Sequence, residues 1–218
     1  MGTTLNFEQL LTAIWETVFM TFCSLLLASI FGLLIGILLY CTQSKGLFEN
    51  RIINRIVDMI VNVLRAIPFM ILLILLIPLT RALVGTMLGA KAALPPLIVS
   101  ATPFYARMCV IAFQEVDKGT IEASKAMGAS NRQIIFKVLL PEALPAIISG
   151  IAVTGISLVG YTAMAGAIGA GGLGNLAYMY GFARRNEAVL YTSTVIIVLI
   201  VFAIQWAGDA LVKKVDKR

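Results

Sequence analysis

Five long apolar runs constrain the fold of this chain more than any other feature. Each is close to the 20 or so residues that a helix needs to cross a hydrocarbon core of roughly 30 Å. A backbone in lipid must satisfy its own polar groups, so runs of this length are expected to be helical. The sequence therefore predicts an all-α polytopic membrane protein, with a single transmembrane domain over residues 1–218. The predicted spans cover approximately residues 17–40, 56–79, 92–113, 144–167 and 188–207.

Composition excludes a soluble globular domain. The chain is 60% hydrophobic and only 13% charged, and its mean hydropathy is +0.95, far from the balance of a soluble protein. The net charge of +6 would suit nucleic-acid binding, but the basic residues cluster at the ends of the apolar runs. We therefore expect the lipid bilayer, and no nucleic acid, among the partners of this chain.

The distribution of basic residues predicts the orientation in the membrane. One side of the predicted bundle carries twelve of the 17 Lys and Arg residues and the other carries four, while Arg65 lies inside the second span. Loops rich in Lys and Arg stay in the cytoplasm, so we expect the N-terminus outside and the C-terminus in the cytoplasm. The twelve are Lys45, Arg51, Arg55, Arg107, Lys118, Lys125, Arg132, Lys137, Lys213, Lys214, Lys217 and Arg218.

Catalytic chemistry finds little support in the sequence. The chain has no histidine and three scattered cysteines, so no ligand cluster for a transition metal is apparent. It contains no G-x-x-x-x-G-K-[ST] pattern and therefore no P-loop for ATP. Carboxylates are missing from the middle of the predicted spans, where a proton- or sodium-driven carrier usually needs one. We predict no catalytic residue, metal or cofactor on this chain, and expect its energy to come from a separate ATPase subunit.

A polar and basic segment, residues 122–141, separates two of the apolar runs. Gly128 suits the left-handed position just beyond a helix end. Ser130 and Gln133 form an S-x-x-Q capping box, which satisfies free amides where the next helix begins. The apolar residues that follow recur at helical spacing and are Ile134, Ile135, Val138 and Leu139. The pattern predicts a helix-turn-helix hairpin on the surface, available for another protein to grip.

This segment resembles the EAA loop of ABC-importer permeases, the cytoplasmic helices that dock into paired ATPase subunits. The family pattern is E-A-A, three residues, G, nine residues and I-x-L-P, and here Ser124 and Val138 replace an Ala and the Ile. The resemblance implies a cytoplasmic coupling loop over residues 115–142. It also implies a set of ATPase-coupling residues: Glu122, Ala123, Ser124, Ala126, Met127, Gly128, Arg132, Leu140 and Pro141.

Two kinds of role are expected within that set. Glu122 and Arg132 would make polar contacts at the docking groove, although Glu122 can also be an ordinary solvated helix charge. Ala123, Ala126 and Met127 would form the inserted face.

Arg65 is the exception inside a predicted span. An arginine at such depth costs about 2.5–3.5 kcal/mol on insertion scales. One interpretation is structural, with Arg65 reaching the cytoplasmic headgroups or bonding carbonyls that Pro68 leaves free. The other has Arg65 lining an aqueous path or bracing a gate, with Asn62 one turn away on the same face. Asn62, Arg65 and Pro68 are therefore candidates for the translocation pathway.

Residues 159–174 are rich in glycine and alanine. Small residues let helices approach closely in lipid, so one interpretation is a tight helix seam that leads into an external turn. The other is that Tyr161 and Met164 border a narrow pathway, because Met is adaptable enough to repack as a gate moves.

Together, the glycine-rich run, the hairpin and the R-x-I-P-F segment at residues 65–69 are similar to the membrane permease subunits of methionine ABC importers. The similarity extends from Trp15 to Asp209. It implies a type I ABC importer permease-like bundle in the bacterial inner membrane, which forms the pathway for methionine, D and/or L. It also implies a homodimer of this chain, two cytoplasmic ABC ATPase subunits with ATP and Mg, and an extracytoplasmic substrate-binding lipoprotein. A permease for another small nutrient and a non-transporting membrane scaffold remain the alternatives.

Overall fold

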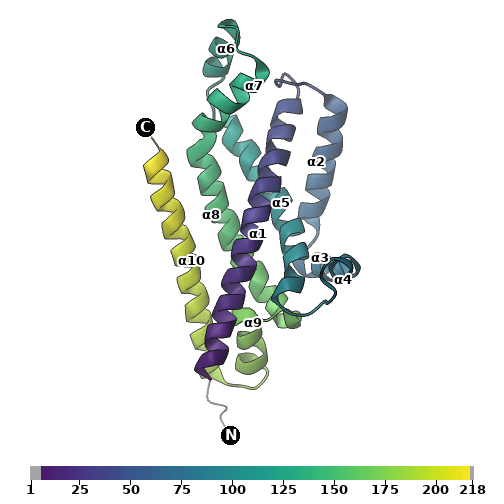
Figure 1. The fold of residues 1–218 in the computed structure, drawn as a ribbon, viewed down its shortest axis with the longest axis vertical. Coiled ribbons are helices and arrows are strands. Elements are labelled where there is room, and N and C mark those ends of the chain that lie inside the picture. Colours follow the sequence, from purple (N-terminus) through teal and green to yellow (C-terminus); the bar gives the residue numbers. More distant parts are fainter. Residues whose placement is uncertain (1–5, 217–218) are drawn as a thin grey trace.

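The computed structural model describes residues 6–216, and every regular element in that range is helical. Figure 1 shows long helices along one axis, with a hairpin at one end and short helices towards the other. Lys217 and Arg218, which the sequence assigns to the cytoplasmic tail, lie outside the described residues. The α-helices are α1 (Phe7–Thr42), α2 (Arg51–Ala66), α3 (Phe69–Leu75), α4 (Ile77–Val84), α5 (Ala90–Gln114), α6 (Lys118–Ala126), α7 (Asn131–Ile134), α8 (Leu140–Ala165), α9 (Gly172–Asn175) and α10 (Glu187–Val215). Three π-helical segments are η1 (Ile135–Leu139), η2 (Gly166–Ala170) and η3 (Leu176–Phe182).

Within residues 6–216, four helices are long and apolar enough to cross a membrane, and a bent helix pair gives a fifth crossing when it is counted as one span. The four are α1, α5, α10 and the continuous rod of α7, η1, α8 and η2 over Asn131–Ala170. The predicted all-α bundle with five spans is therefore confirmed. All four continuous spans extend beyond the apolar runs that predicted them.

The second predicted span, residues 56–79, is not one continuous helix. The helix α2 ends at Ala66, and α3 begins at Phe69 after a bend of 105°. Pro68 explains the break, because proline has no amide to donate and disfavours helical backbone at the residue before it. Ile67 is accordingly extended, with φ −76° and ψ 121°. Beyond the bend, α3 and α4 lie across the bundle (Figure 1).

The helix α5 lies at the centre of the bundle and packs along α1. Two glycines on α1 make this crossing close. A Cβ added to Gly32 would lie 2.8 Å from the Tyr105 ring, and one added to Gly36 would lie 2.6 Å from the Cβ of Cys109. Both distances are too short for a side chain, so these positions let the two backbones approach closely, as small residues do in membranes.

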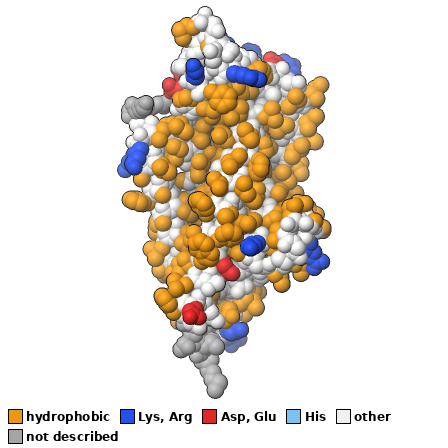
Figure 2. Space-filling view, viewed as in Figure 1, with side chains coloured by type: hydrophobic (Ala, Val, Ile, Leu, Met, Phe, Trp, Pro, Cys, Tyr) orange, Lys and Arg blue, Asp and Glu red, His pale blue; other side chains and the backbone are white. Residues whose placement is uncertain are grey.

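The outer surface matches a lipid environment. Figure 2 shows hydrophobic side chains over most of one face, with charged side chains gathered mainly towards the two ends of the long axis. Large exposed apolar residues on α1 and α10 include Phe22, Phe202 and Trp206. An apolar surface of this extent is unusual for a soluble monomer.

Candidate functional site

The hairpin predicted at residues 122–141 is present at one end of the molecule (Figure 1). The helix α6 ends in a Schellman motif, in which Gly128 N–H donates to the Lys125 carbonyl at 2.9 Å and Ala129 N–H to the Ser124 carbonyl at 3.0 Å. Gly128 has a φ of +82°. The predicted left-handed glycine between two helices is therefore confirmed.

The predicted capping box is also present. Gln133 N–H donates to Ser130 Oγ at 3.4 Å, and Ser130 N–H donates to Gln133 Oε1 at 2.8 Å. Asn131, which follows Ser130, donates from its side-chain Nδ2 to the Leu47 carbonyl at 2.6 Å. This bond fastens the start of α7 to the loop between α1 and α2.

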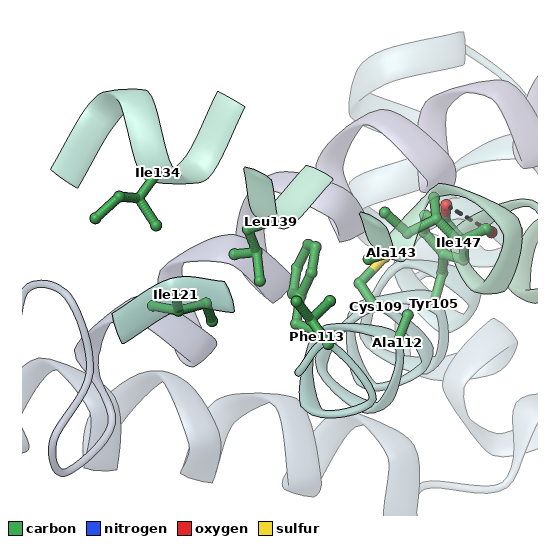
Figure 3. Close-up of a cluster of buried hydrophobic side chains, with 10 residues drawn as sticks. Tyr105, Cys109, Ala112, Phe113, Ile121, Ile134, Leu139, Ala143 and Ile147 are labelled. Atoms are coloured by element: carbon green, nitrogen blue, oxygen red, sulfur yellow. Dashed lines mark hydrogen bonds between the residues drawn. The ribbon is translucent and has the colours of Figure 1, made fainter. Parts of the chain in front are cut away.

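The inner face of the hairpin belongs to the hydrophobic core. Ile121 on α6, Ile134 on α7 and Leu139 on η1 form one buried cluster with Phe113 on α5 and Ala143 on α8. Figure 3 shows these side chains in a row that leads from the hairpin towards the bundle. The hairpin therefore shares one close-packed core with α5 and α8, and interiors of this kind transmit displacement.

The outer face of the hairpin exposes two large apolar side chains. Met127 is 82% exposed and Phe136 is 67% exposed. Phe136 was not among the predicted coupling residues. Its signal in the sequence is an aromatic residue on the side of the helix opposite the buried apolar positions. Six other predicted coupling residues are also exposed, namely Glu122, Ala123, Ala126, Gly128, Arg132 and Pro141.

Three of the predicted coupling residues serve the shape of the hairpin. Ser124 is only 7% exposed, and its hydroxyl donates to the Thr120 carbonyl at 2.8 Å. Leu140 is half-buried against the core cluster. Pro141 is exposed and lies inside the continuous rod, directly after η1, where its missing amide removes one hydrogen bond from the backbone ladder.

Electrostatics in the adjoining loop centre on Glu49. Its carboxylate accepts from Lys45 N–H at 3.0 Å and from Arg51 Nε at 3.1 Å. These two contacts, the backbone amide first, hold the pKa of Glu49 below its ordinary value. Within residues 6–216, no group of three or more Cys, Asp or Glu side chains is placed to hold a metal ion.

A polar network joins α2 to α5 and includes the predicted pathway residue Asn62. Arg107 Nη2 donates to Asp58 Oδ1 at 2.7 Å and to Asn62 Oδ1 at 3.0 Å, and Asn62 Nδ2 donates to Asp58 Oδ2 at 2.9 Å. The pairing of Arg107 with Asp58 was not among the predictions made from the sequence. A signal was present in the polar residues that share one face of α2 at helical spacing, which are Arg51, Asn54, Arg55, Asp58, Asn62 and Arg65.

Arg65 lies in the last turn of α2 and is exposed. Among the described residues it has no hydrogen-bond or ion-pair partner. The carbonyl bonds that one interpretation expected for Arg65 are thus not formed within residues 6–216. Its cation instead lies at a helix C-terminus, where the helix dipole favours positive charge. Pro68 itself is exposed and caps the start of α3.

The predicted pathway residue Tyr161 lies beside the bend of the second span. Its ring stacks on Phe69, with 4.8 Å between the ring centroids and 13° between the planes. Phe69 follows Pro68 directly, so the bend and the glycine-rich end of α8 meet here. Met164, one turn further along α8, is 46% exposed. Asn62 thus belongs to the network around Arg107, and Pro68 and Tyr161 lie at the bend with Met164 one turn away, while Arg65 bonds to neither group.

Known proteins are similar to this chain in sequence and in the arrangement of their helices. The methionine import system permease protein MetP of Bacillus subtilis is 53% identical over 181 residues, which are 83% of this chain and 82% of MetP. The probable D-methionine transport system permease protein MetI of Vibrio cholerae is 44% identical over 214 residues, 98% of this chain and 95% of that protein. A chain of the MetNI methionine ABC transporter, solved in inward-facing conformations, matches with a TM-score of 0.94 and 48% identity, over 97% of this chain and 98% of that chain.

A family-level match covers the same elements. Residues 28–218 match the binding-protein-dependent transport system inner membrane component. This range contains the bent second span, the hairpin and the glycine-rich segment, and it leaves out only the first part of α1 and the residues before it. The chain therefore belongs to the family of binding-protein-dependent transport system inner membrane components.

Proposed function

We propose that this chain is the membrane-spanning permease subunit of an ATP-driven ABC importer and forms the translocation pathway for methionine, as the D and/or L enantiomer. The observation that carries the proposal is the likeness to the MetNI methionine transporter, with a TM-score of 0.94 at 48% identity over nearly the whole chain. The identity of 53% to a methionine import permease supports the same cargo.

The proposed orientation puts the hairpin in the cytoplasm and the N-terminus outside. It is supported by the twelve Lys and Arg residues expected on the hairpin side of the membrane, against four on the other. The proposed assembly contains two copies of this chain and two cytoplasmic ATPase subunits that use ATP and Mg. A substrate-binding lipoprotein delivers methionine from outside the bacterial inner membrane.

Residues 115–142 are the proposed coupling loop. Met127 and Phe136 are its apolar anchors in the ATPase groove, and Glu122 and Arg132 make polar contacts at the rim. Closure of the ATPase dimer on ATP moves the two hairpins together. Because the hairpin shares its core with α5 and α8, the motion switches the packed bundle between two discrete states rather than bending it.

The proposed pathway runs past the two groups of predicted residues. Asn62 and Arg65, with Asp58 and Arg107, form its polar part, since charged side chains at membrane depth face water or protein rather than lipid. The outer part of the pathway is bordered by Pro68, Tyr161 and Met164, with Tyr161 beside the bend. The described conformation corresponds to the inward-facing state, as the similarity to inward-facing MetNI suggests.

Uptake by the reconstituted complex tests the proposal. Vesicles with this chain, its ATPase and its binding protein should accumulate radiolabelled methionine only with ATP on the cytoplasmic face. An excess of unlabelled D- or L-methionine should compete, whereas other amino acids should not. ATP-driven uptake of a different nutrient with none of methionine would favour a permease of other specificity. Complete absence of ATP-driven uptake would favour the non-transporting scaffold.

A cysteine introduced at the hairpin tip tests the orientation separately. Met127→Cys should react with a membrane-impermeant maleimide only when the cytoplasmic face is accessible. Labelling from outside intact cells would overturn the orientation and the coupling role together.

A further inference from the structure

Glu16 and Thr17 on α1 hold a backbone segment that lies 156 residues further along the chain. Gly172 N–H donates to Glu16 Oε2 at 2.6 Å, and Leu173 N–H donates to Thr17 Oγ1 at 2.9 Å. A hydrogen bond to a carboxylate is shorter and roughly twice as strong as one between neutral groups. These two bonds, here called the α1 tie, fix the point at which the chain enters α9.

The glycines at this point are suited to the α1 tie. Gly171 and Gly172 have φ values of +82° and +74°, which side chains other than glycine rarely adopt. A Cβ added to Gly171 would collide with the Glu16 carboxylate, and one added to Gly172 would lie 2.7 Å from Thr17 Oγ1. Glycine at positions 171 and 172 therefore allows α1 to approach the backbone at the start of α9.

The segment fixed by the α1 tie packs directly on the last turn of α8. Asn175 Nδ2 donates to the Gly166 carbonyl at 3.1 Å. A Cβ added to Gly174 would collide with the backbone of Ala163, so α9 and α8 are in close contact there. The turn at residues 163–166 also carries Met164, which is 46% exposed. The α1 tie is therefore connected through α9 to the turn that carries Met164.

We propose that Glu16 is a positioning residue for transport. Through the α1 tie it holds α9 and the Met164 turn in the arrangement described here, and weakening the tie favours the alternative state of the bundle. The proposal rests on the proposed function, in which residues 163–174 lie at the outer end of the pathway. A contact made in only one of two states sets their balance by its own free energy. Glu16 is half-buried beside a cavity of about 320 Å³, which gives the carboxylate and α9 room to separate.

Amide hydrogen exchange on the assembled complex tests the tie itself. Glu16→Ala removes the acceptor for Gly172 N–H, whereas Glu16→Gln keeps an oxygen there. Glu8→Gln is the matched control, because Glu8 lines the same cavity two turns away on α1. We expect exchange in residues 163–175 to rise strongly with Glu16→Ala, less with Glu16→Gln, and not at all with Glu8→Gln. Unchanged exchange in Glu16→Ala would overturn the tie.

ATP hydrolysis without the binding protein tests the positioning role. Counted per assembled complex, Glu16→Ala should raise this basal rate by about tenfold, which corresponds to about 1.4 kcal/mol in the balance of states. Methionine taken up per ATP should fall. Thr17→Val should act in the same direction, and Thr17→Ser, which keeps the hydroxyl, should restore normal coupling.

The outcomes separate this proposal from others. A purely structural role for Glu16 would lower the amount of assembled complex but leave its basal rate and coupling unchanged, and that result would overturn the proposal. Should Glu16→Ala fail to assemble, Glu16→Gln and Thr17→Val carry the same test. If the unaltered complex showed no ATP-driven uptake, the proposed function would fail, while the exchange experiment would still decide whether the tie exists.

Discussion

The guanidinium of Arg107 on α5 lies 2.7 Å from the carboxylate of Asp58 on α2 and joins the bent helix pair to the centre of the bundle. Asn62 bonds to both side chains and completes a triangle. The side chains of Arg107 and Asp58 are 28% and 40% exposed, so the pair is not sealed in the core. We place the pair at the cytoplasmic end of the proposed pathway, because Arg107 is one of the basic residues expected on the hairpin side of the membrane.

Removing one partner of this pair should destabilise the protein by more than half of the loss seen when both partners are removed. Arg107→Ala or Asp58→Ala leaves one charge without its counterion, whereas the double variant leaves none. We expect each single substitution to cost about 1–2 kcal/mol, because partial exposure screens both charges. The double variant should cost less than the sum of the two.

Thermal unfolding of the purified complex measures these variants as shifts in Tm. Arg51→Ala is the control, because Arg51 pairs with Glu49 but its side chain is 80% exposed. Its Tm should stay close to that of the unaltered protein. Strictly additive losses in the Arg107 and Asp58 variants would show that the two residues are not coupled.

Gly128→Ala should destabilise the hairpin by about 1 kcal/mol. A Cβ at this position meets nothing within 4 Å, so the cost comes from the φ of +82° alone. Gly160→Ala is the matched control, since it also has open space but lies within a regular helix. It should leave stability unchanged or raise it, because alanine favours helix more than glycine does.

Transport gives a second measure at Gly128. A large residue, as in Gly128→Trp, should uncouple ATP hydrolysis from uptake while the protein still inserts into the membrane. Normal uptake with tryptophan at this position would contradict the role of the hairpin turn.

The hairpin shows what local sequence determines. The left-handed Gly128 and the Ser130–Gln133 capping box depend on groups within five residues of one another. Their geometry follows from backbone rules that hold in any tertiary context. The apolar lengths likewise predicted the spans, because lipid leaves a backbone no alternative to helix.

Long-range contacts were beyond the sequence for a physical reason. Arg107 and Asp58 are 49 residues apart, and Glu16 and Gly172 are 156 apart. No periodicity relates such pairs, so only the packing of the helices brings them together. The bend at Pro68 could be predicted from the sequence only in part. The proline predicts a weak point, but its 105° angle depends on where α3 can pack.

Acid should loosen the loop at residues 43–50. Lys45 N–H and Arg51 hold the pKa of Glu49 below its ordinary value of 4.5. A carboxyl group with a lowered pKa in the folded state stabilises that state above its unfolded pKa, and this contribution is lost as the pH falls through the folded value. The contribution of Glu49 is therefore complete at neutral pH and disappears only in acid.

Carbon-13 NMR of labelled glutamate side chains can follow this titration. The Glu49 resonance should have a midpoint below 4.5, and Glu49→Gln identifies it by its disappearance. A midpoint at or above 4.5 would mean that the contacts with Lys45 and Arg51 do not persist in solution.

Phe136→Ala should weaken binding of the ATPase subunits to this chain. Phe136 is 67% exposed on the outer face of the hairpin, and a large aromatic anchor at the centre of an interface contributes about 2 kcal/mol or more when truncated. That loss corresponds to roughly a thirtyfold rise in Kd. Copurification of the ATPase with the detergent-solubilised permease, followed over a dilution series, measures it.

Phe202→Ala is the matched control, because Phe202 has the same side chain and is 64% exposed, but lies on α10 within the apolar surface of the bundle. Its loss should leave ATPase binding unchanged. Met127→Ala, at the other exposed apolar position of the hairpin, should act in the same direction as Phe136→Ala, because both side chains belong to the proposed docking face. If Phe136→Ala and Phe202→Ala retained the ATPase equally, the outer face of the hairpin would not be the docking surface. The ATPase could then not act on α5 through Ile134 and Leu139 in the hairpin core.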